Sequence, residues 1–180
     1  MSVYELTQQN VVAPAPSGLP NEFTQTGEIQ SKGFEIEGKL SLNDQLDLLG
    51  SYTYTNARVT QSTTNDLGKV PLWIPQNMAS VWADYTFRDG NLNGLGFGLG
   101  VRYIGETFGN AGNTLLIPAY TLVDAAIHYD LAGLNPQLKG LRFSVNASNL
   151  FDKVYVSECT NANCLYGLRR SVLATLRYKW

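Results

Sequence analysis

The hydrophobic pattern is clearest at the end of the chain. From Arg170 onward, Val172, Ala174, Leu176, Tyr178 and Trp180 alternate with residues that include Thr175, Arg177 and Lys179. A period of two predicts a strand with one apolar and one polar face. The apolar face ends in two aromatic residues at the C-terminus. This is typical of a strand whose apolar face lies against lipid and whose polar face lines a lumen.

The same alternation recurs along the chain and predicts about eight strands. Most are near the ~9–11 residues of a transmembrane strand. The predicted strands cover residues 2–12, 27–43, 46–60, 79–87, 95–103, 120–131, 141–147 and 167–180.

The connections between these strands alternate in length. Short turns are predicted at 43–44, 89–94 and 132–140, and long loops at 13–26, 61–76, 107–118 and 149–166. Short periplasmic turns and long extracellular loops characterise outer-membrane barrels. We therefore predict an all-β, antiparallel transmembrane β-barrel segment with its C-terminus on the periplasmic side.

The composition narrows the classes of protein to which the chain could belong. The 180 residues are 44% hydrophobic and 16% charged, with a net charge of −2 and no basic stripe. A nucleic-acid partner is therefore not expected. No apolar run approaches the ~18 residues of a spanning helix. The N-terminus lacks the charged and apolar regions of a secretory signal, so an exported chain of this kind is expected to be mature, processed or part of a longer protein.

Cys159 and Cys164 both lie in the last long loop. A disulfide fits an oxidising cell-surface loop. The alternatives are two free thiols or a weak metal pair. Zinc would need two further ligands, and His128, the one histidine of the chain, is predicted on a strand far from this loop.

Charged residues gather on the polar faces of three predicted strands. In the expected register Asp124, His128 and Asp130 face Arg102 and Arg142. Such a group could be an acid–base or metal constellation, or ion pairs on a polar lumen wall. We favour the interpretation as ion pairs on a lumen wall, and we predict that the protein is not an enzyme and has no metal site.

Four alternating glycines, Gly94, Gly96, Gly98 and Gly100, leave one face of a strand bare. They do not complete a dinucleotide-binding fingerprint, because Leu99 and Val101 occupy the place of its third glycine. They indicate either strand bending or room for a bulky group close to the wall.

Trp73, Phe108 and Tyr166 lie in or beside the long loops. Aromatic side chains there could form a vestibule for a ligand, and we predict these three as substrate contacts. The alternative is that each is a girdle residue or packs within its loop.

Several segments resemble a known family. They are Ile74-Pro75-Gln76-Asn77-Met78-Ala79-Ser80-Val81-Trp82 followed by Tyr85, the run Ile117 to Asp124, Asn146-Ala147-Ser148-Asn149-Leu150-Phe151-Asp152-Lys153-Val154-Tyr155, and the cysteine pair followed by Tyr166-Gly167-Leu168-Arg169-Arg170. The chain resembles the C-terminal barrel of TonB-dependent outer-membrane receptors, and within them the ferric-hydroxamate (ferrichrome-type) siderophore receptors. These carry a similar disulfide in their last extracellular loop.

The resemblance implies a 22-stranded barrel with an N-terminal plug, in the outer membrane of Gram-negative bacteria. Residues 1–180 would be the C-terminal portion of that barrel, without the plug. The implied partners are a ferric siderophore, the TonB complex through the missing N-terminal region, outer-membrane lipids and the barrel-assembly machinery. Tyr178 and Trp180, which replaces the family's commoner Phe, would form the C-terminal assembly signal. No cofactor is implied, because iron is carried as the siderophore substrate.

Two alternatives stay open. The chain could be a self-contained eight-stranded barrel with a structural or adhesive role, since eight strands suffice to close a barrel. Within transport, cobalamin or another metal chelate could replace the siderophore.

Overall fold

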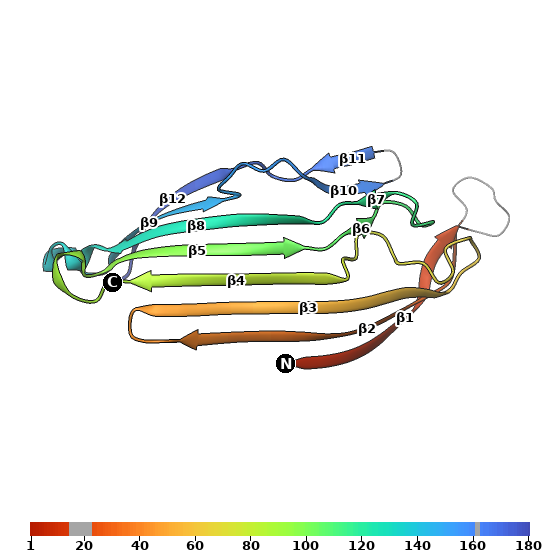
Figure 1. The fold of residues 1–180 in the computed structure, drawn as a ribbon, viewed down its shortest axis with the longest axis horizontal. Coiled ribbons are helices and arrows are strands. Elements are labelled where there is room, and N and C mark those ends of the chain that lie inside the picture. Colours follow the sequence, from red (N-terminus) through yellow and green to blue (C-terminus); the bar gives the residue numbers. More distant parts are fainter. Residues whose placement is uncertain (15–22, 161–162) are drawn as a thin grey trace.

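One antiparallel sheet of eight strands dominates the molecule (Figure 1). The structure, a computed structural model, describes residues 1–14, 23–160 and 163–180. The sheet order is β1-β2-β3-β4-β5-β8-β9-β12. These strands are β1 (Ser2–Pro14), β2 (Phe23–Ser41), β3 (Leu46–Gln61), β4 (Asn77–Thr86), β5 (Leu95–Ile104), β8 (Tyr120–Asp130), β9 (Leu141–Ser148) and β12 (Ser171–Tyr178).

From β2 to β12 the connections alternate between short and long as predicted, and they contain added structure. The long connections contain two small hairpins, β6 (Thr107–Phe108) with β7 (Leu116–Ile117), and β10 (Val156–Thr160) with β11 (Asn163–Tyr166). The short ones contain the 3₁₀ turns η1 (Gly90–Leu92), η2 (Leu131–Gly133) and η3 (Pro136–Leu138). Treating 107–118 and 149–166 as plain loops was therefore wrong, because period-two reading cannot detect pairings of so few residues.

The first strands extend further than predicted. β1 runs to Pro14 and β2 begins at Phe23, within the predicted loop 13–26, of which residues 15–22 lie outside the described part. Pro14 is the last residue of β1. β1, β2 and β3 have 13, 19 and 16 residues, whereas β9 and β12 have 8 each.

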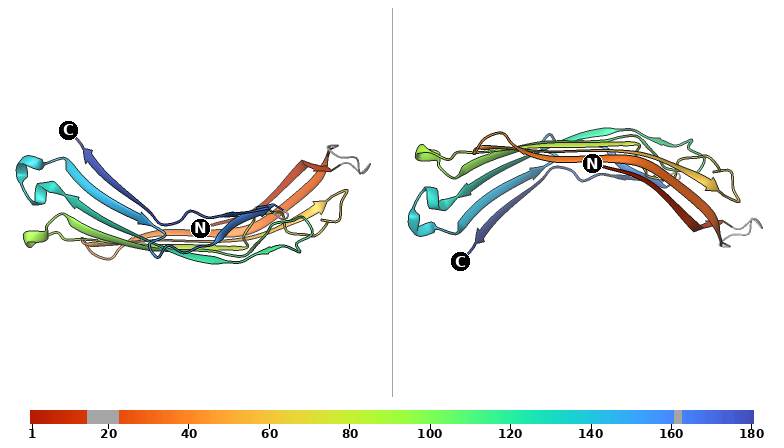
Figure 2. Two further views of the ribbon diagram at one scale, coloured as in Figure 1. Left: turned by 90° about the horizontal axis from the view of Figure 1, so that it is seen from above. Right: turned by 90° about the horizontal axis from the view of Figure 1, so that it is seen from below.

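The sheet is curved and open (Figures 1 and 2). Within the described ranges, β1 pairs with β2 alone and β12 with β9 alone. A self-contained eight-stranded barrel needs β1 to pair with β12, so this structure does not support that alternative. An open sheet leaves two rows of unpaired backbone groups, which in lipid cost several kcal/mol each.

The register aligns one set of mostly apolar residues across six strands, β3, β4, β5, β8, β9 and β12, on one face. Val81 lies between Gly50 and Val101, Val101 lies beside Val123, and Ala147 lies between Ala125 and Val172. Much of this face is exposed: Val81 is 58% and Leu99 is 55% accessible. We call it the apolar face, and the opposite one the polar face.

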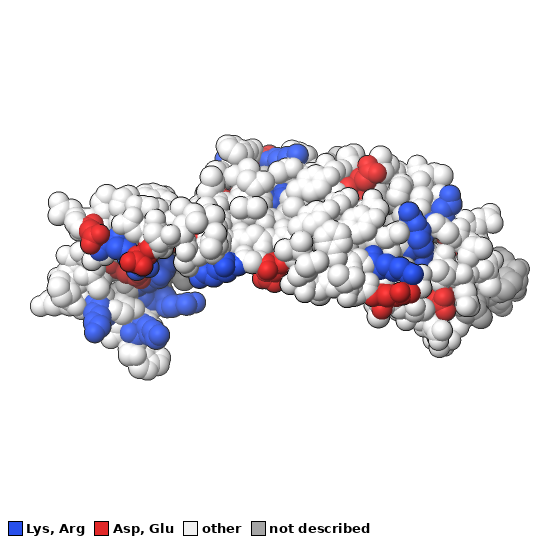
Figure 3. All heavy atoms as spheres, turned by 60° about the horizontal axis from the view of Figure 1, so that its bottom comes forward, with Lys and Arg blue, Asp and Glu red and all other residues white. Residues whose placement is uncertain are grey.

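Aromatic side chains lie toward both ends of the apolar face. On the long-loop side the Phe34 ring is 5.7 Å from those of Tyr52 and Tyr54. On the short-turn side Phe87 lies 5.1 Å from Tyr85 and 6.4 Å from Phe97. Leu46 pairs with Tyr85, and Tyr54 follows eight residues later on β3. At ~3.3 Å per residue and a tilt of about 40°, the two belts are roughly 20 Å apart. Figure 3 shows charged residues as scattered groups on a largely uncharged surface in one view.

The most buried large side chain lies under the loops. Ile117 is 2% and Cys159 is 4% accessible, and Thr107 is 7%. Ile117 pairs with Thr107 in the β6–β7 hairpin. The loops therefore have a small core of their own. Across the described residues, we find no helix long and apolar enough to span a membrane.

Candidate functional site: the outer mouth and the polar wall

Trp73 joins two neighbouring loops. Its backbone N–H donates to the Phe108 carbonyl at 3.2 Å, and its indole Nε1–H donates to the Cys159 carbonyl at 2.6 Å. Its φ of +60° is unusual for a bulky residue. Two of the three predicted contact residues, Trp73 and Phe108, therefore lie together at the mouth.

Tyr166 occupies a different part of the mouth. It lies on β11, where it pairs with Val156, and it is 72% accessible. The hydrogen bonds around Trp73 do not include it. The assignment of Trp73, Phe108 and Tyr166 as substrate contacts remains a prediction.

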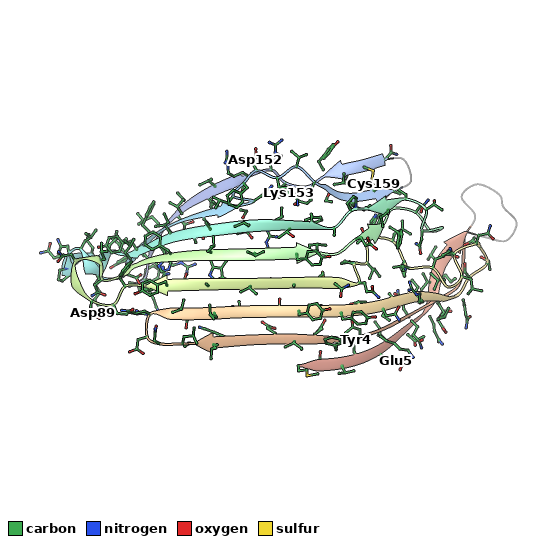
Figure 4. The ribbon with its side chains drawn as sticks, in the orientation of Figure 1. Tyr4, Glu5, Asp89, Asp152, Lys153 and Cys159 are labelled. Carbon is green, nitrogen blue, oxygen red and sulfur yellow. A yellow bond between two sulfur atoms is a disulfide. The ribbon has the colours of Figure 1, made fainter. Side chains whose placement is uncertain are left out.

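The cysteine pair closes the β10–β11 hairpin. Cys159 and Cys164 face each other in the register, and their sulfurs are joined by a 2.02 Å disulfide, as predicted. Cys159 is buried, and Figure 4 shows it near β7. The disulfide therefore fixes a loop that is already packed at the mouth.

A cavity of about 500 Å³ opens beside Phe108. It lies where β3 continues past the start of β4. Arg58 and Glu106 give its lining opposite charges, and sequence reasoning singled out neither. Its other lining residues are Thr55, Asn56, Ala57, Val70, Ile74, Gln76, Asn77, Tyr103, Gly105, Asn113 and Ala119. This mixed lining suits a polar ligand with small apolar groups.

The Asn146 to Tyr155 segment is a structural turn. Asn149, 3% accessible with φ of +52°, accepts from Lys153 N–H at 2.8 Å and donates to the carbonyls of Lys153 and Leu168 at 2.8 and 3.1 Å. Its own N–H donates to Asp124 at 2.9 Å. Asn149 thus ties the end of β9 to β8 and to the chain entering β12.

Asp152 anchors the other side of this turn, outside the sheet strands (Figure 4). Its carboxylate accepts from the Arg169 guanidinium and, at 2.9 Å, from Arg170 N–H. The hydrogen bond from Arg169 and then the one from Arg170 N–H hold the pKa of Asp152 far below its usual range. Asp152 is therefore ionised throughout the physiological range.

The predicted charge cluster divides into separate pairs. Arg102 Nη2 donates to Asp124 at 3.0 Å, and Arg142 lies 3.6 Å from Asp130. His128 instead meets Asp84, with Nε2 at 3.1 and 3.2 Å from its oxygens. Sequence reasoning did not single out Asp84, although alternation along β4 places it on the polar face. In the described ranges no group of three or more His, Cys, Asp or Glu could hold a metal ion.

The bare glycine face is covered by neighbouring side chains. A Cβ on Gly98 or Gly100 would overlap the Trp82 ring, and a Cβ on Gly96 would overlap the His128 ring. The bulky groups close to the wall are therefore the protein's own. Beside them lies a hollow of about 450 Å³ lined by Arg142, Arg177 and other polar-face residues.

The predicted assembly signal lies at an open edge. Tyr178 ends β12, and its ring centroid is 6.4 Å from that of Trp180, which is 98% accessible. Its role in assembly remains a prediction.

An exposed apolar face between two aromatic belts, a polar opposite face and asymmetric connections define a section of an outer-membrane β-barrel wall. A sequence profile described as "TonB dependent receptor-like, beta-barrel" matches residues 1–150. The chain belongs to this family.

Curated relatives match along the whole chain. The ferrichrome outer membrane transporter/phage receptor of Escherichia coli is 41% identical over 99% of this chain and 24% of its own length. The ferrioxamine B receptor of Salmonella typhimurium is 36% identical over 98% of this chain and 25% of its own. The chain thus spans about a quarter of these relatives.

Solved structures share the fold. The ferric preacinetobactin receptor of Acinetobacter baumannii superposes with a TM-score of 0.79 at 23% identity, over 98% of this chain and 26% of that one. The ferric yersiniabactin uptake receptor of Yersinia pestis gives 0.78 at 16% identity, over 98% and 26%. These likenesses support an open sheet that forms part of a larger barrel.

Proposed function

We propose that this chain forms the C-terminal part of the barrel of a receptor that takes up ferric hydroxamate siderophores, energised through the TonB complex. The observation that carries the proposal is its likeness, along 99% of its length, to a ferrichrome transporter. The likeness to a ferrioxamine B receptor supports the same ligand class. The eight strands would be part of a 22-stranded barrel.

The proposed ligand site is at the mouth. Trp73, Phe108 and Tyr166 would contact the siderophore, because aromatic rings offer large contact area at low entropic cost. Iron would enter as cargo, without a resident cofactor. The ion pairs of the polar wall would be structural, and the protein would not be an enzyme.

The remaining partners follow from the two faces. Outer-membrane lipids would cover the apolar face, and the barrel-assembly machinery would bind Tyr178 and Trp180. A plug and a TonB-contacting segment would come from a region outside these 180 residues. No nucleic acid would bind.

The test is binding and uptake of iron-labelled ferrichrome and ferrioxamine B by cells expressing the full-length polypeptide that carries this sequence. Alanine substitution of Trp73, Phe108 or Tyr166 should weaken binding at least about fivefold, because anchor residues contribute more than ~1 kcal/mol. Leu168→Ala is the control, because Leu168 is 84% accessible.

Two results would count against the proposal. Unchanged affinity in all three variants would remove the site assignment. Binding of cyanocobalamin, with no binding of either siderophore, would show that the ligand is a cobalamin and not a hydroxamate siderophore.

A further inference from the structure

Three long connections meet around Trp73 and Cys159. They are residues 62–76 between β3 and β4, the β6–β7 hairpin and the disulfide-closed β10–β11 hairpin. Trp73 contacts both hairpins, through the Phe108 carbonyl and the Cys159 carbonyl. A left-handed backbone at a tryptophan costs about 1–3 kcal/mol and persists where surrounding contacts hold it.

A second set of contacts joins the first two connections. The side-chain amide of Asn113 donates to the Val70 carbonyl at 2.9 Å, and its oxygen accepts from the Val70 N–H at 2.8 Å. The Asn113 side chain therefore makes the same two hydrogen bonds to Val70 that a paired strand residue would make, although Asn113 does not lie in a strand. Residues 62–76 and the β6–β7 hairpin are therefore joined at two points.

The disulfide hairpin packs directly on the β6–β7 hairpin. A Cβ added to Gly109 would lie 2.7 Å from the Cys159 Cβ and 3.0 Å from its carbonyl oxygen. A side chain at residue 109 would thus push Cys159 away. Position 112 of the same loop is open, since a Cβ there would meet Thr114 Cγ2 at 3.9 Å.

We propose that Trp73 is a positioning residue whose indole N–H fastens the disulfide hairpin to the other two connections, so that the three form one preformed rim. This rests on the proposed function, in which the rim surrounds the siderophore entry. Ligand affinity then depends on the rim being assembled before binding, because preorganisation removes the entropic cost of ordering loops. This role differs from direct stacking on the ligand, which needs the ring and not its N–H.

The experiment compares Trp73→Phe, Gly109→Ala and Gly112→Ala in the full-length polypeptide that carries this sequence. Trp73→Phe keeps an aromatic ring and removes the donor. Gly109→Ala displaces Cys159 without changing Trp73, and Gly112→Ala is its matched control. Two quantities are measured: amide hydrogen exchange of residues 156–160, and the dissociation constant for ferrichrome and for ferrioxamine B.

Trp73→Phe and Gly109→Ala should each speed exchange at 156–160 by about fivefold, the equivalent of one neutral hydrogen bond. Both substitutions should raise the dissociation constant by a similar factor, for whichever of the two siderophores the unmodified polypeptide binds. Gly112→Ala should change neither quantity.

Unchanged exchange in Trp73→Phe overturns the fastening role, even if affinity falls, because the ring would then act on the ligand directly. Faster exchange with unchanged affinity overturns the link to binding. If the unmodified polypeptide binds neither siderophore, the proposed function fails, while the exchange measurement still tests the rim.

Discussion

The sheet and the rim of loops are stabilised in different ways. In the sheet, large apolar side chains on both faces are exposed, such as Val81 on the apolar face at 58% and Leu173 on the polar face at 64%, although His128 and Leu122 on the polar face of β8 are buried. The rim buries Ile117 and Cys159 almost completely. The sheet is held by its hydrogen-bond ladder and depends on what covers its faces, whereas the rim has its own packing.

The sheet and the rim differ in this way because they are surrounded by different solvents. A barrel wall meets lipid on one side and a filled or wet lumen on the other, so its outward residues need no protein partner. Loops outside the membrane meet water and must bury apolar groups against each other. Substitutions should therefore act globally in the sheet and locally in the rim.

The largest effect is expected from Ile117→Ala, which removes the most buried large side chain described. Truncation of a buried isoleucine costs about 2–5 kcal/mol. Local opening of the rim, measured by hydrogen exchange, should rise accordingly, while heat-modifiable gel mobility stays unchanged. Leu116→Ala, at a neighbouring residue that is 50% accessible, is the control. Loss of the folded barrel band would contradict an independent rim.

Next comes Leu99→Arg on the apolar face. A cation facing lipid near the membrane centre costs about 2–4 kcal/mol. Leu49→Arg is the matched control, because Leu49 is 45% accessible and lies on the polar face beside Trp82. Urea unfolding of barrels in lipid vesicles should show that Leu99→Arg greatly lowers the free energy of unfolding and that Leu49→Arg lowers it only slightly. Equal losses would contradict the assignment of the faces.

A smaller loss is expected from Gly100→Val. The added side chain would overlap the Trp82 ring, and overpacking costs about 1–3 kcal/mol. Trp82→Ala in the same chain should recover part of the stability. Gly38→Val is the control, since a Cβ there meets nothing within 4 Å. If the Gly100→Val barrel were as stable as the Gly38→Val barrel, the Trp82 ring would not depend on the absence of a side chain at position 100.

Asp152→Asn should have the smallest effect, because Asp152 and Arg169 are a partly exposed pair. The folded pKa of Asp152 is lowered, so its stabilisation is present above the unfolded pKa and is lost as pH falls through the folded value. Protection factors at 149–153, which are corrected for the pH dependence of intrinsic exchange, should be slightly lower in the variant. The ratio of the two proteins' protection factors should stay constant from pH 5 to 8, because Asp152 stays ionised over this range. A transition inside that range would contradict the lowered pKa.

The sequence predicted features that depend on neighbours along the chain. Alternation at residues 95–103 and 120–131 located β5 and β8 and their faces, because side-chain direction repeats every two residues. The disulfide followed from two cysteines in one loop. The pairing of His128 with Asp84 and the cover of Trp82 over Gly98 depend on register between strands, which alternation on one strand does not give.

The mouth was the hardest region to predict. Trp73 and Phe108 were singled out as aromatic loop residues, but Asn113 and Gly109, which join the loops, carry no distinctive local pattern. Their contacts arise from segments far apart in the chain. They follow from the tertiary arrangement of the loops alone.

The most direct test of the account is the environment of successive positions on β12 in native outer membranes. Spin labels would be placed singly from Val172 to Arg177, and the accessibility of each to oxygen and to a water-soluble nickel chelate compared. The account predicts a high oxygen-to-nickel ratio at Val172, Ala174 and Leu176, and a low ratio at Leu173, Thr175 and Arg177. The same ratio at all six positions would contradict a wall with one face in lipid.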